Sequence, residues 1–222
     1  MMRAPEATRG QHSPVVPDRS PEQSLTVDPD PASRFAESAA SVRRFGVATG
    51  LLEDGLARRR PGGLVLEFGV YTGRSINLIA ERIPLGEIVF GFDSFAGLPQ
   101  DWRPGFGKGA FATAIPEVRP NVRLVVGLFE DTLPPFLAAH AGPTSFIHVD
   151  CDLYASTRTV LDLCRDRIGA GTVIVFDEYC NYPGWQAHEH RAFLEFVAET
   201  GRSFDYVSVV PGGEQVGVLI TG

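Results

Sequence analysis

The chain is poor in cysteine and lysine and contains no long apolar run. Its 222 residues include a single lysine and three cysteines, Cys151, Cys164 and Cys180. An odd number of cysteines, without the close spacing of a metal knuckle, predicts neither a disulfide framework nor a zinc site. No apolar stretch approaches the ~18 residues that cross a bilayer, and the polar amino terminus lacks the apolar core of a signal peptide. We therefore expect a cytoplasmic protein with no membrane segment.

Positive charge is also in the minority. The chain has 20 Lys and Arg residues against 27 Asp and Glu residues, which gives a formal net charge of −7 at pH 7. Nucleic acids and anionic membrane surfaces bind proteins through a basic footprint. The composition therefore argues against either as the main partner of this protein.

The first 33 residues differ in composition from the rest of the chain. They contain six prolines and no Phe, Tyr or Trp, and such a stretch cannot bury enough apolar area to offset the entropy cost of ordering. We expect residues 1–33 to form a disordered leader. Residues 34–60 carry apolar side chains at roughly helical spacing and predict an N-terminal helical segment that could act as a lid. The main domain is expected over residues 61–222.

Within the main domain, short apolar runs alternate with helical patterns, which predicts an α/β fold. Strands joined by helical crossovers form a parallel, doubly wound sheet with helices on both faces. A short Gly-rich turn joins the last two strands, so one of them is expected to run antiparallel. The seven expected strands are 64–68, 88–93, 122–126, 146–150, 172–177, 204–210 and 216–221.

Acidic residues stand at the carboxyl ends of the first two expected strands, where doubly wound sheets bind ligands. Glu67 to Gly73 has the spacing E-x-G-x-x-x-G, which is not the G-x-G-x-x-G of a dinucleotide-binding turn. The looser loop suits a ligand with no phosphate and a positively charged amino-acid end; the alternative is a plain turn between strand and helix. Asp93 can accept two hydrogen bonds from vicinal ribose hydroxyls, or else cap the turn that follows it.

A second group of acids follows two later strands. Asp150, Asp177 and Glu178 are expected to converge, and their mutual repulsion would be relieved by a hard divalent cation such as Mg²⁺. In the alternative arrangement, Asp150 or Asp152 caps the helix that starts near Ser156 while Glu178 points to water. His148 lies inside the apolar strand and is expected to be a satisfied core residue.

Several longer motifs resemble those of class I S-adenosylmethionine-dependent methyltransferases. More narrowly, they are similar to the macrocin O-methyltransferase family, which modifies deoxysugars on macrolide and aminocoumarin antibiotics. The resemblance covers roughly residues 60–222 and implies a Rossmann-like sheet of seven strands, mostly parallel, with an antiparallel last strand. The motifs that carry it are 67–73, 91–99, 127–134, 148–157 and 177–185.

The resemblance also implies roles for individual residues. Asp152 matches the proposed base, and Asp150, Asp177 and Glu178 match the Mg²⁺ ligands, although related enzymes commonly have a second Asp where this chain has Glu178. The residues implied to bind S-adenosylmethionine are Glu67, Gly69, Gly73, Ser75, Asp93, Ser94, Phe129, Glu130 and Asp150.

The resulting hypothesis is an O-methyltransferase, assisted by Mg²⁺, that acts on a sugar hydroxyl of a glycosylated natural product. Its partner would be a small-molecule acceptor, and a homo-oligomer is possible. One alternative is a metal-independent methyltransferase of another small molecule. A second is a nicotinamide-dependent oxidoreductase, against which the missing G-x-G-x-x-G counts. A third is a cofactor-binding module without catalysis.

Overall fold

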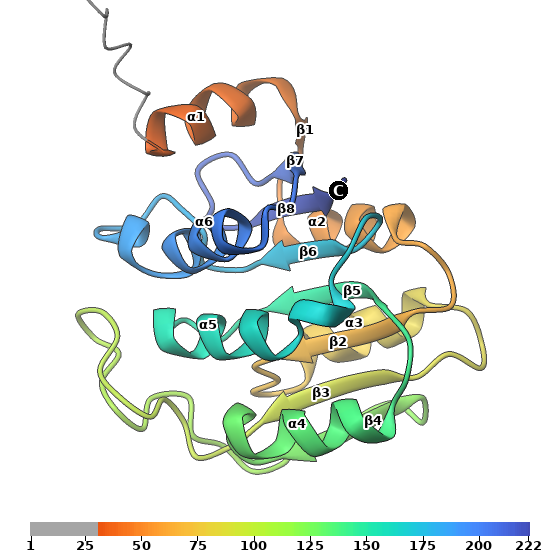
Figure 1. Ribbon diagram of the computed structural model, residues 1–222. Helices are drawn as coiled ribbons and strands as arrows, with labels where there is room; N and C mark the ends of the chain where they lie inside the picture. The colour runs from red at the N-terminus through yellow and green to blue at the C-terminus, as the bar shows by residue number, and fades with distance from the viewer. Residues whose placement is uncertain (1–30) are drawn as a thin grey trace, which may run out of the picture.

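The computed structural model describes residues 31–222 of the chain (Figure 1). Residues 1–30, the greater part of the expected leader, lie outside the described residues. Helix α1 (Pro31–Ser41) begins inside the segment that was expected to be disordered. Within this helix, Phe35 is buried.

A sheet of eight strands in the order β1-β7-β8-β6-β5-β2-β3-β4 forms the centre of the molecule. Within it, β8 runs antiparallel to its neighbours β6 and β7, while the other neighbouring pairs are parallel. The strands are β1 (Arg43–Arg44), β2 (Leu64–Phe68), β3 (Val89–Asp93), β4 (Val122–Val126), β5 (Thr144–Val149), β6 (Val173–Phe176), β7 (Phe204–Val209) and β8 (Val216–Ile220).

This sheet confirms the expected α/β fold with an antiparallel last strand and adds an eighth strand to the seven expected. The added strand, β1, pairs in parallel with β7 through only Arg43 and Arg44. Two exposed arginines carry no apolar alternation, which is why sequence periodicity did not indicate a strand there.

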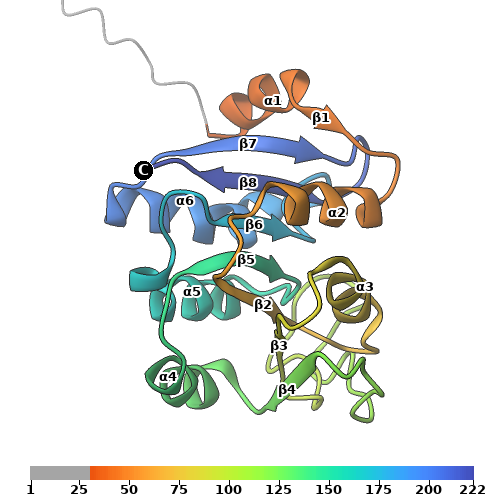
Figure 2. The same cartoon turned by 90° about the vertical axis from the view of Figure 1, so that its right-hand side faces the viewer.

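Helices cover both faces of the sheet. Helices α2 and α3 lie on one face and α4, α5 and α6 on the other, as Figures 1 and 2 show. Helix α4 starts at Phe129 and has Leu128 at its N-cap position, without a side-chain cap. The helices are α2 (Ala48–Arg58), α3 (Arg74–Arg82), α4 (Phe129–Ala139), α5 (Tyr154–Leu163) and α6 (Glu189–Thr200), with short 3-10 turns at Arg165–Arg167 and Trp185–Ala187.

Each face of the sheet has its own apolar core. Leu51 of α2 belongs to the same cluster as Val65 and Ile79, whereas Phe68 and Phe193 belong to the cluster on the opposite face. Successive side chains of a strand point to opposite faces, so β2 serves both cores. Because Leu51 is completely buried, the segment before residue 61 is built into the domain.

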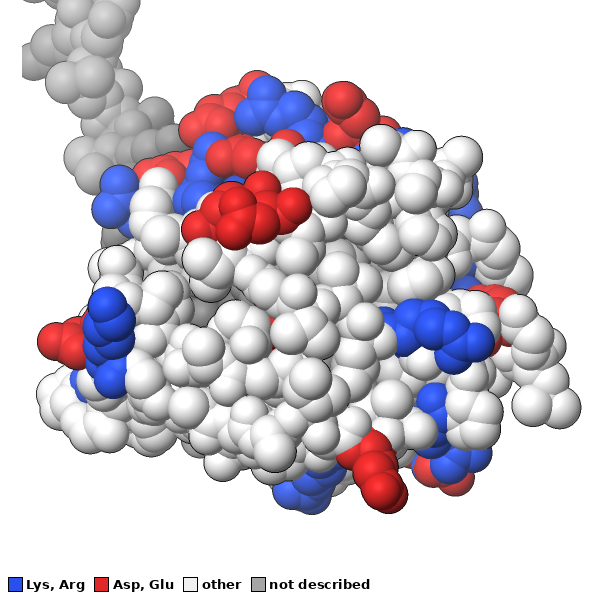
Figure 3. All heavy atoms as spheres, turned by 90° about the horizontal axis from the view of Figure 1, so that it is seen from below, with Lys and Arg blue, Asp and Glu red and all other residues white. Residues whose placement is uncertain are grey.

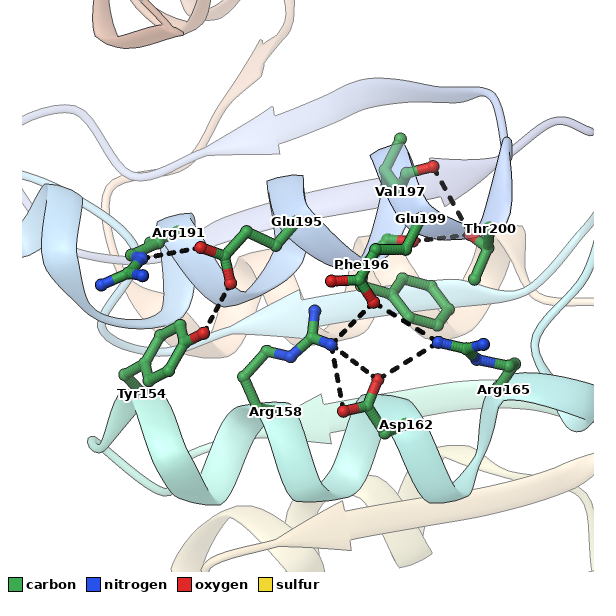
Figure 4. Close-up of polar contacts among 10 residues, drawn as sticks. All are labelled: Tyr154, Arg158, Asp162, Arg165, Arg191, Glu195, Phe196, Val197, Glu199 and Thr200. Atoms are coloured by element: carbon green, nitrogen blue, oxygen red, sulfur yellow. Dashed lines mark hydrogen bonds and ion pairs between the residues drawn. The ribbon is translucent and has the colours of Figure 1, made fainter.

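A surface network of charged groups joins α5 to α6 (Figure 4). The Arg158 guanidinium lies 2.9 Å from carboxylate oxygens of both Asp162 and Glu199. The Tyr154 hydroxyl donates to Glu195 at 2.5 Å, so this side chain is directed toward α6. Exposed ion pairs of this kind each contribute about 0–1 kcal/mol to stability, which leaves the apolar cores as the main source of cohesion.

Charge is thinly spread over the face seen in Figure 3. There, Lys and Arg side chains lie singly or beside acids, around a centre that is uncharged. No helix between residues 31 and 222 is both long enough and apolar enough to cross a membrane.

Phe35 fixes α1 to the rest of the fold. Its ring lies 5.1 Å from that of Tyr206, 5.4 Å from Tyr179 and 5.8 Å from Trp185, measured between centroids. Edge-to-face pairs of this kind add to the gain from burial. The N-terminal helix is thereby joined to the segment that follows β6.

Replacing Phe35 by Ala should destabilise the whole domain. Removing a buried Phe costs about 3–5 kcal/mol, which should lower the midpoint of thermal unfolding by about 10 °C for a chain of this size. Circular dichroism measures the shift, with Leu85→Ala as the control because Leu85 is fully exposed. Equal melting temperatures for the two variants would mean that α1 is not part of the cooperative unit.

Candidate active site

A cavity of about 280 Å³ opens at the carboxyl ends of β2, β3 and β5. This is the edge at which the sequence predicted a ligand site. Many residues implied by the resemblance line it. They are Gly69, Asp93, Ser94, Phe129, Glu130, Asp150, Asp152 and Glu178.

Gly69 allows the ends of β2 and β5 to approach closely. Its φ is +93°, and a Cβ atom built there would lie 1.7 Å from the carbonyl oxygen of Asp150. The Gly69 N–H donates to the Phe92 carbonyl, and the Asp150 N–H donates to that of Phe68, both at 2.9 Å. A side chain at position 69 would therefore push Asp150 away from the cavity.

Asp93 holds the loop after β2. The N–H groups of Val70 and Tyr71 both donate to its Oδ2 at 2.8 Å, and the N–H of Phe95 donates to its Oδ1 at 2.7 Å. A carboxylate offers about four acceptor positions, so one remains. Asp93 therefore caps the turn that follows it, which was the alternative role, and its binding of ribose hydroxyls stays a prediction.

Three of the implied cofactor residues lie behind the cavity wall. Glu67 is completely buried, and its Oε1 accepts a hydrogen bond from the Ser75 hydroxyl at 2.7 Å. Gly73 starts α3 with a φ of +79° and faces Pro116. None of these three residues lines the cavity, and the Glu67 carboxylate instead accepts its hydrogen bond from Ser75 in α3.

Glu67 also pairs with His148. The two side chains are buried, and Nδ1 of His148 lies 3.7 Å from Oε2 of Glu67. Burial by itself lowers the pKa of the imidazole, but the Glu67 carboxylate, together with the charges of Asp150 and Asp177, more than offsets this and raises the pKa to about 9. His148 is therefore a core residue as expected, but it is a charged member of an ion pair. Neither of its ring nitrogens has a hydrogen-bond partner among residues 31–222.

The acids predicted to converge do so. Asp150, Asp177 and Glu178 each offer a carboxylate oxygen, and these oxygens all lie within 4.8 Å of one another. Glu178 is 9% exposed, so the alternative in which it points to water is wrong. The capping alternative is also wrong, because Leu153 precedes α5 and no side chain caps this helix.

The donor set fits a hard divalent cation. Burial, followed by the charge of Asp177, raises the pKa of Asp150 well above its usual range, and burial raises that of Glu178 in the same way. Oε2 of Glu178 is buried without a hydrogen-bond partner among the described residues. Carboxylate oxygens that repel one another, one of them without a hydrogen-bond partner, are suited to binding Mg²⁺. The extra methylene of Glu178, compared with an Asp, does not remove its carboxylate from the cluster.

Asp152 stands next to this cluster in a strained conformation. Its φ is +63°, a region that non-glycine residues rarely occupy and that is frequent at functional sites. The side chain is buried and lines the cavity. Burial raises its pKa to about 7, although the nearby Arg103 acts in the opposite direction.

The loop between β3 and β4 covers one side of the site. Nη1 of Arg103 donates to both carboxylate oxygens of Glu214, at 3.0 and 2.9 Å. The same guanidinium lies over the rings of Trp102 and Tyr182, 4.0 and 4.6 Å from their centroids. This loop is therefore fastened to the turn between β7 and β8.

Sequence reasoning missed part of the cavity wall. Tyr71 and Phe111 line it with their rings 5.6 Å apart in an edge-to-face pair, and both have a positive φ. Leu128 and Thr159 also line the cavity. Tyr71 and Leu128 lie inside the motifs 67–73 and 127–134, so the sequence could have indicated them as site residues. Phe111 and Thr159 lie outside the motifs and are brought to the site only by the tertiary fold.

Comparison with known proteins now settles the family. A profile described as a methyltransferase domain matches residues 66–179, just over half of the chain. The chain belongs to this methyltransferase family. The matched residues include the loop after β2, the strand that ends at Asp93, and the cluster of three acids.

Individual relatives agree with this assignment. The 8-demethyl-8-(2,3-dimethoxy-alpha-L-rhamnosyl)-tetracenomycin-C 4′-O-methyltransferase of Streptomyces olivaceus is 30% identical over 168 residues, which are 65% of this chain and 63% of that protein. The match thus spans less than two thirds of that relative's length.

Solved structures share the fold. The crystal structure of a calicheamicin methyltransferase superposes with a TM-score of 0.65 and 24% identity, over 97% of this chain and 100% of that one. An O-methyltransferase of Streptomyces achromogenes involved in tomaymycin synthesis, solved in complex with S-adenosylmethionine, gives a TM-score of 0.53 and 21% identity over 90% and 93%.

The Glu67–His148 pair should make stability depend on pH. The pKa of His148 is raised above its usual value, so the pair's contribution is complete below about pH 6.5 and is lost as the pH rises through about 9. The shift corresponds to about 3 kcal/mol. Glu67→Gln should therefore cost most stability at pH 6 and least at pH 9.5, as measured by urea unfolding.

Ser75→Ala is the matched control for this experiment. It removes the other hydrogen bond to Glu67 while leaving the ion pair intact, so its pH profile should follow that of the wild type. A stability difference between wild type and Glu67→Gln that stays constant from pH 6 to 9.5 would contradict the account.

Proposed function

We propose that this protein is an O-methyltransferase that uses S-adenosylmethionine to methylate a sugar hydroxyl of a natural product. The observation that carries the proposal is the cluster of Asp150, Asp177 and Glu178, of which Asp150 and Glu178 line the cavity together with Asp152. The narrower placement in the macrocin O-methyltransferase family rests on the sequence motifs that contain these acids.

The cavity suits the donor in chemical character. Its wall combines the carboxylate of Asp93 with the apolar surfaces of Leu98, Leu128 and Phe129, which match a ribose and a flat aromatic base. S-adenosylmethionine, when bound, supplies an electrophilic methyl group on a sulfonium sulfur. The tomaymycin enzyme with the same fold was solved with this molecule, and the loop after β2 lacks the glycine spacing of a nicotinamide-binding turn.

Protein groups then perform the remaining tasks. Methyl transfer is an in-line displacement, so the protein mainly positions the acceptor oxygen and keeps water out. The Asp152 carboxylate, fixed by its strained backbone, accepts the proton of the acceptor hydroxyl at a carboxylate oxygen. The loop that carries Arg103 closes the same side of the site through Glu214.

Asp150, Asp177 and Glu178 would hold the divalent cation. A bound Mg²⁺ lowers the pKa of an oxygen that it contacts and neutralises the carboxylates around it. Sugar rings carry vicinal hydroxyls that can present two oxygens to one cation. The rhamnosyl group named in the tetracenomycin relative supports a glycosylated acceptor.

Asp152→Asn should abolish turnover without affecting donor binding. The amide cannot take a proton, so kcat should fall by about 10²–10⁴-fold, while the affinity for S-adenosylhomocysteine stays within about twofold. Release of S-adenosylhomocysteine in the presence of a rhamnosylated acceptor measures the first quantity, and titration calorimetry the second. The proposal fails if calorimetry detects NADH binding but no binding of S-adenosylhomocysteine to the wild type.

Removal of divalent cations should stop the reaction reversibly. Dialysis against EDTA is expected to abolish turnover, and added Mg²⁺ should restore it. Asp177→Asn should remain inactive after the same addition, because it lacks one anionic ligand. Full activity of both the wild type and Asp177→Asn in EDTA would favour the alternative of a metal-independent methyltransferase.

A further inference from the structure

A completely buried carboxylate lies beside the three candidate metal ligands. Glu189, the first residue of α6, is 0% exposed. Its Oε2 accepts a hydrogen bond from the backbone N–H of Glu178 at 3.1 Å. Its Oε1 is buried and has no hydrogen-bond partner among residues 31–222. A buried carboxylate with one unpartnered oxygen lowers stability. Its presence therefore suggests that Glu189 has a function other than stabilising the fold.

The surroundings of Glu189 connect it to the cation site. The charged groups that act on its carboxyl are the acids Asp152, Asp150 and Asp177. Glu189 is not a member of the group whose oxygens all lie within 4.8 Å of one another. It therefore lies next to the ligands, as an outer neighbour that touches Glu178 through the backbone.

The turn after β6 shows why that contact matters. The Asp177 N–H donates to the carbonyl of Val149, and the Tyr179 N–H donates to the carbonyl of Glu214, both at 2.9 Å. The N–H of Glu178, between them, is held by the Glu189 side chain. Without that oxygen, a buried N–H would lose its acceptor and the peptide that orients Glu178 would be released.

We propose that Glu189 is a positioning residue for the metal ligand Glu178, which it fixes by accepting the hydrogen bond of the Glu178 backbone. This inference rests on the proposed function, because it assumes that the three acids bind a divalent cation. Groups that orient metal ligands through hydrogen bonds typically change metal affinity by 10–100-fold when they are removed.

Two substitutions separate the hydrogen bond from the charge. Glu189→Gln retains an oxygen that can accept from the Glu178 N–H, whereas Glu189→Leu has a similar volume and no acceptor. Mn²⁺ serves as the probe, and water-proton relaxation measures its dissociation constant without any need for turnover. Glu195→Leu is the matched control, since Glu195 lies on the same helix in the surface network with Arg191.

The proposal expects Mn²⁺ affinity to fall by 10–100-fold in Glu189→Leu and to stay within about threefold of wild type in Glu189→Gln and Glu195→Leu. Binding of S-adenosylhomocysteine, measured by calorimetry, should be unchanged in all three variants, which also shows that each is folded. Unchanged Mn²⁺ affinity in Glu189→Leu, or an equal loss in Glu189→Gln, would overturn the positioning role. A wild type that binds no Mn²⁺ would instead overturn the cation site itself.

Discussion

Repulsion among partly and fully buried carboxylates is the constraint on which the site depends. Asp150, Asp177, Glu178 and Glu189 lie together where the strands end, and burial raises the pKa of Asp150, Glu178 and Glu189. A folded protein retains such a group only if something compensates for it. A cation that binds there would offset the repulsion between the carboxylates, whose oxygens would coordinate it next to the cavity that suits a methyl donor.

The supporting structure consists of fixed backbone contacts. Gly69 lets β2 and β5 approach so that Asp150 faces the cavity, and Asp93 uses three backbone N–H groups to hold the loop after β2. Behind them, Glu67 and His148 form a buried ion pair. These contacts fix the backbone around the cavity. Substitutions at Tyr71, Phe111 and other loop residues could then change the shape of the cavity, and loops are where selectivity commonly resides.

The sequence predicted the elements whose signal is local. The apolar runs located seven strands, and the acids that follow the strands located the site, because parallel strands deliver their ends to one edge. What it could not supply depends on contacts across the fold. Arg103 and Glu214 meet although they are 111 residues apart, and the short strand of Arg43 and Arg44 has no apolar pattern.

Two acids show the limit most clearly. Glu67 was expected to contact the ligand; in the structure it is completely buried on the same face as Val65 and does not line the cavity. Glu189 was overlooked, although it shares the buried stripe of α6 with Ala192, Phe193 and Phe196. An acid among the apolar residues of one helix face can be recognised from the sequence as a buried charge. Its role becomes evident only when the structure shows its partner, the Glu178 N–H.

The most direct test of the central claim is anomalous diffraction from a crystal soaked with Mn²⁺ and S-adenosylhomocysteine. The account predicts a manganese peak bounded by carboxylate oxygens of Asp150, Asp177 and Glu178, with the thioether ligand in the adjoining cavity. Clear density for S-adenosylhomocysteine without a manganese peak among these acids would contradict it.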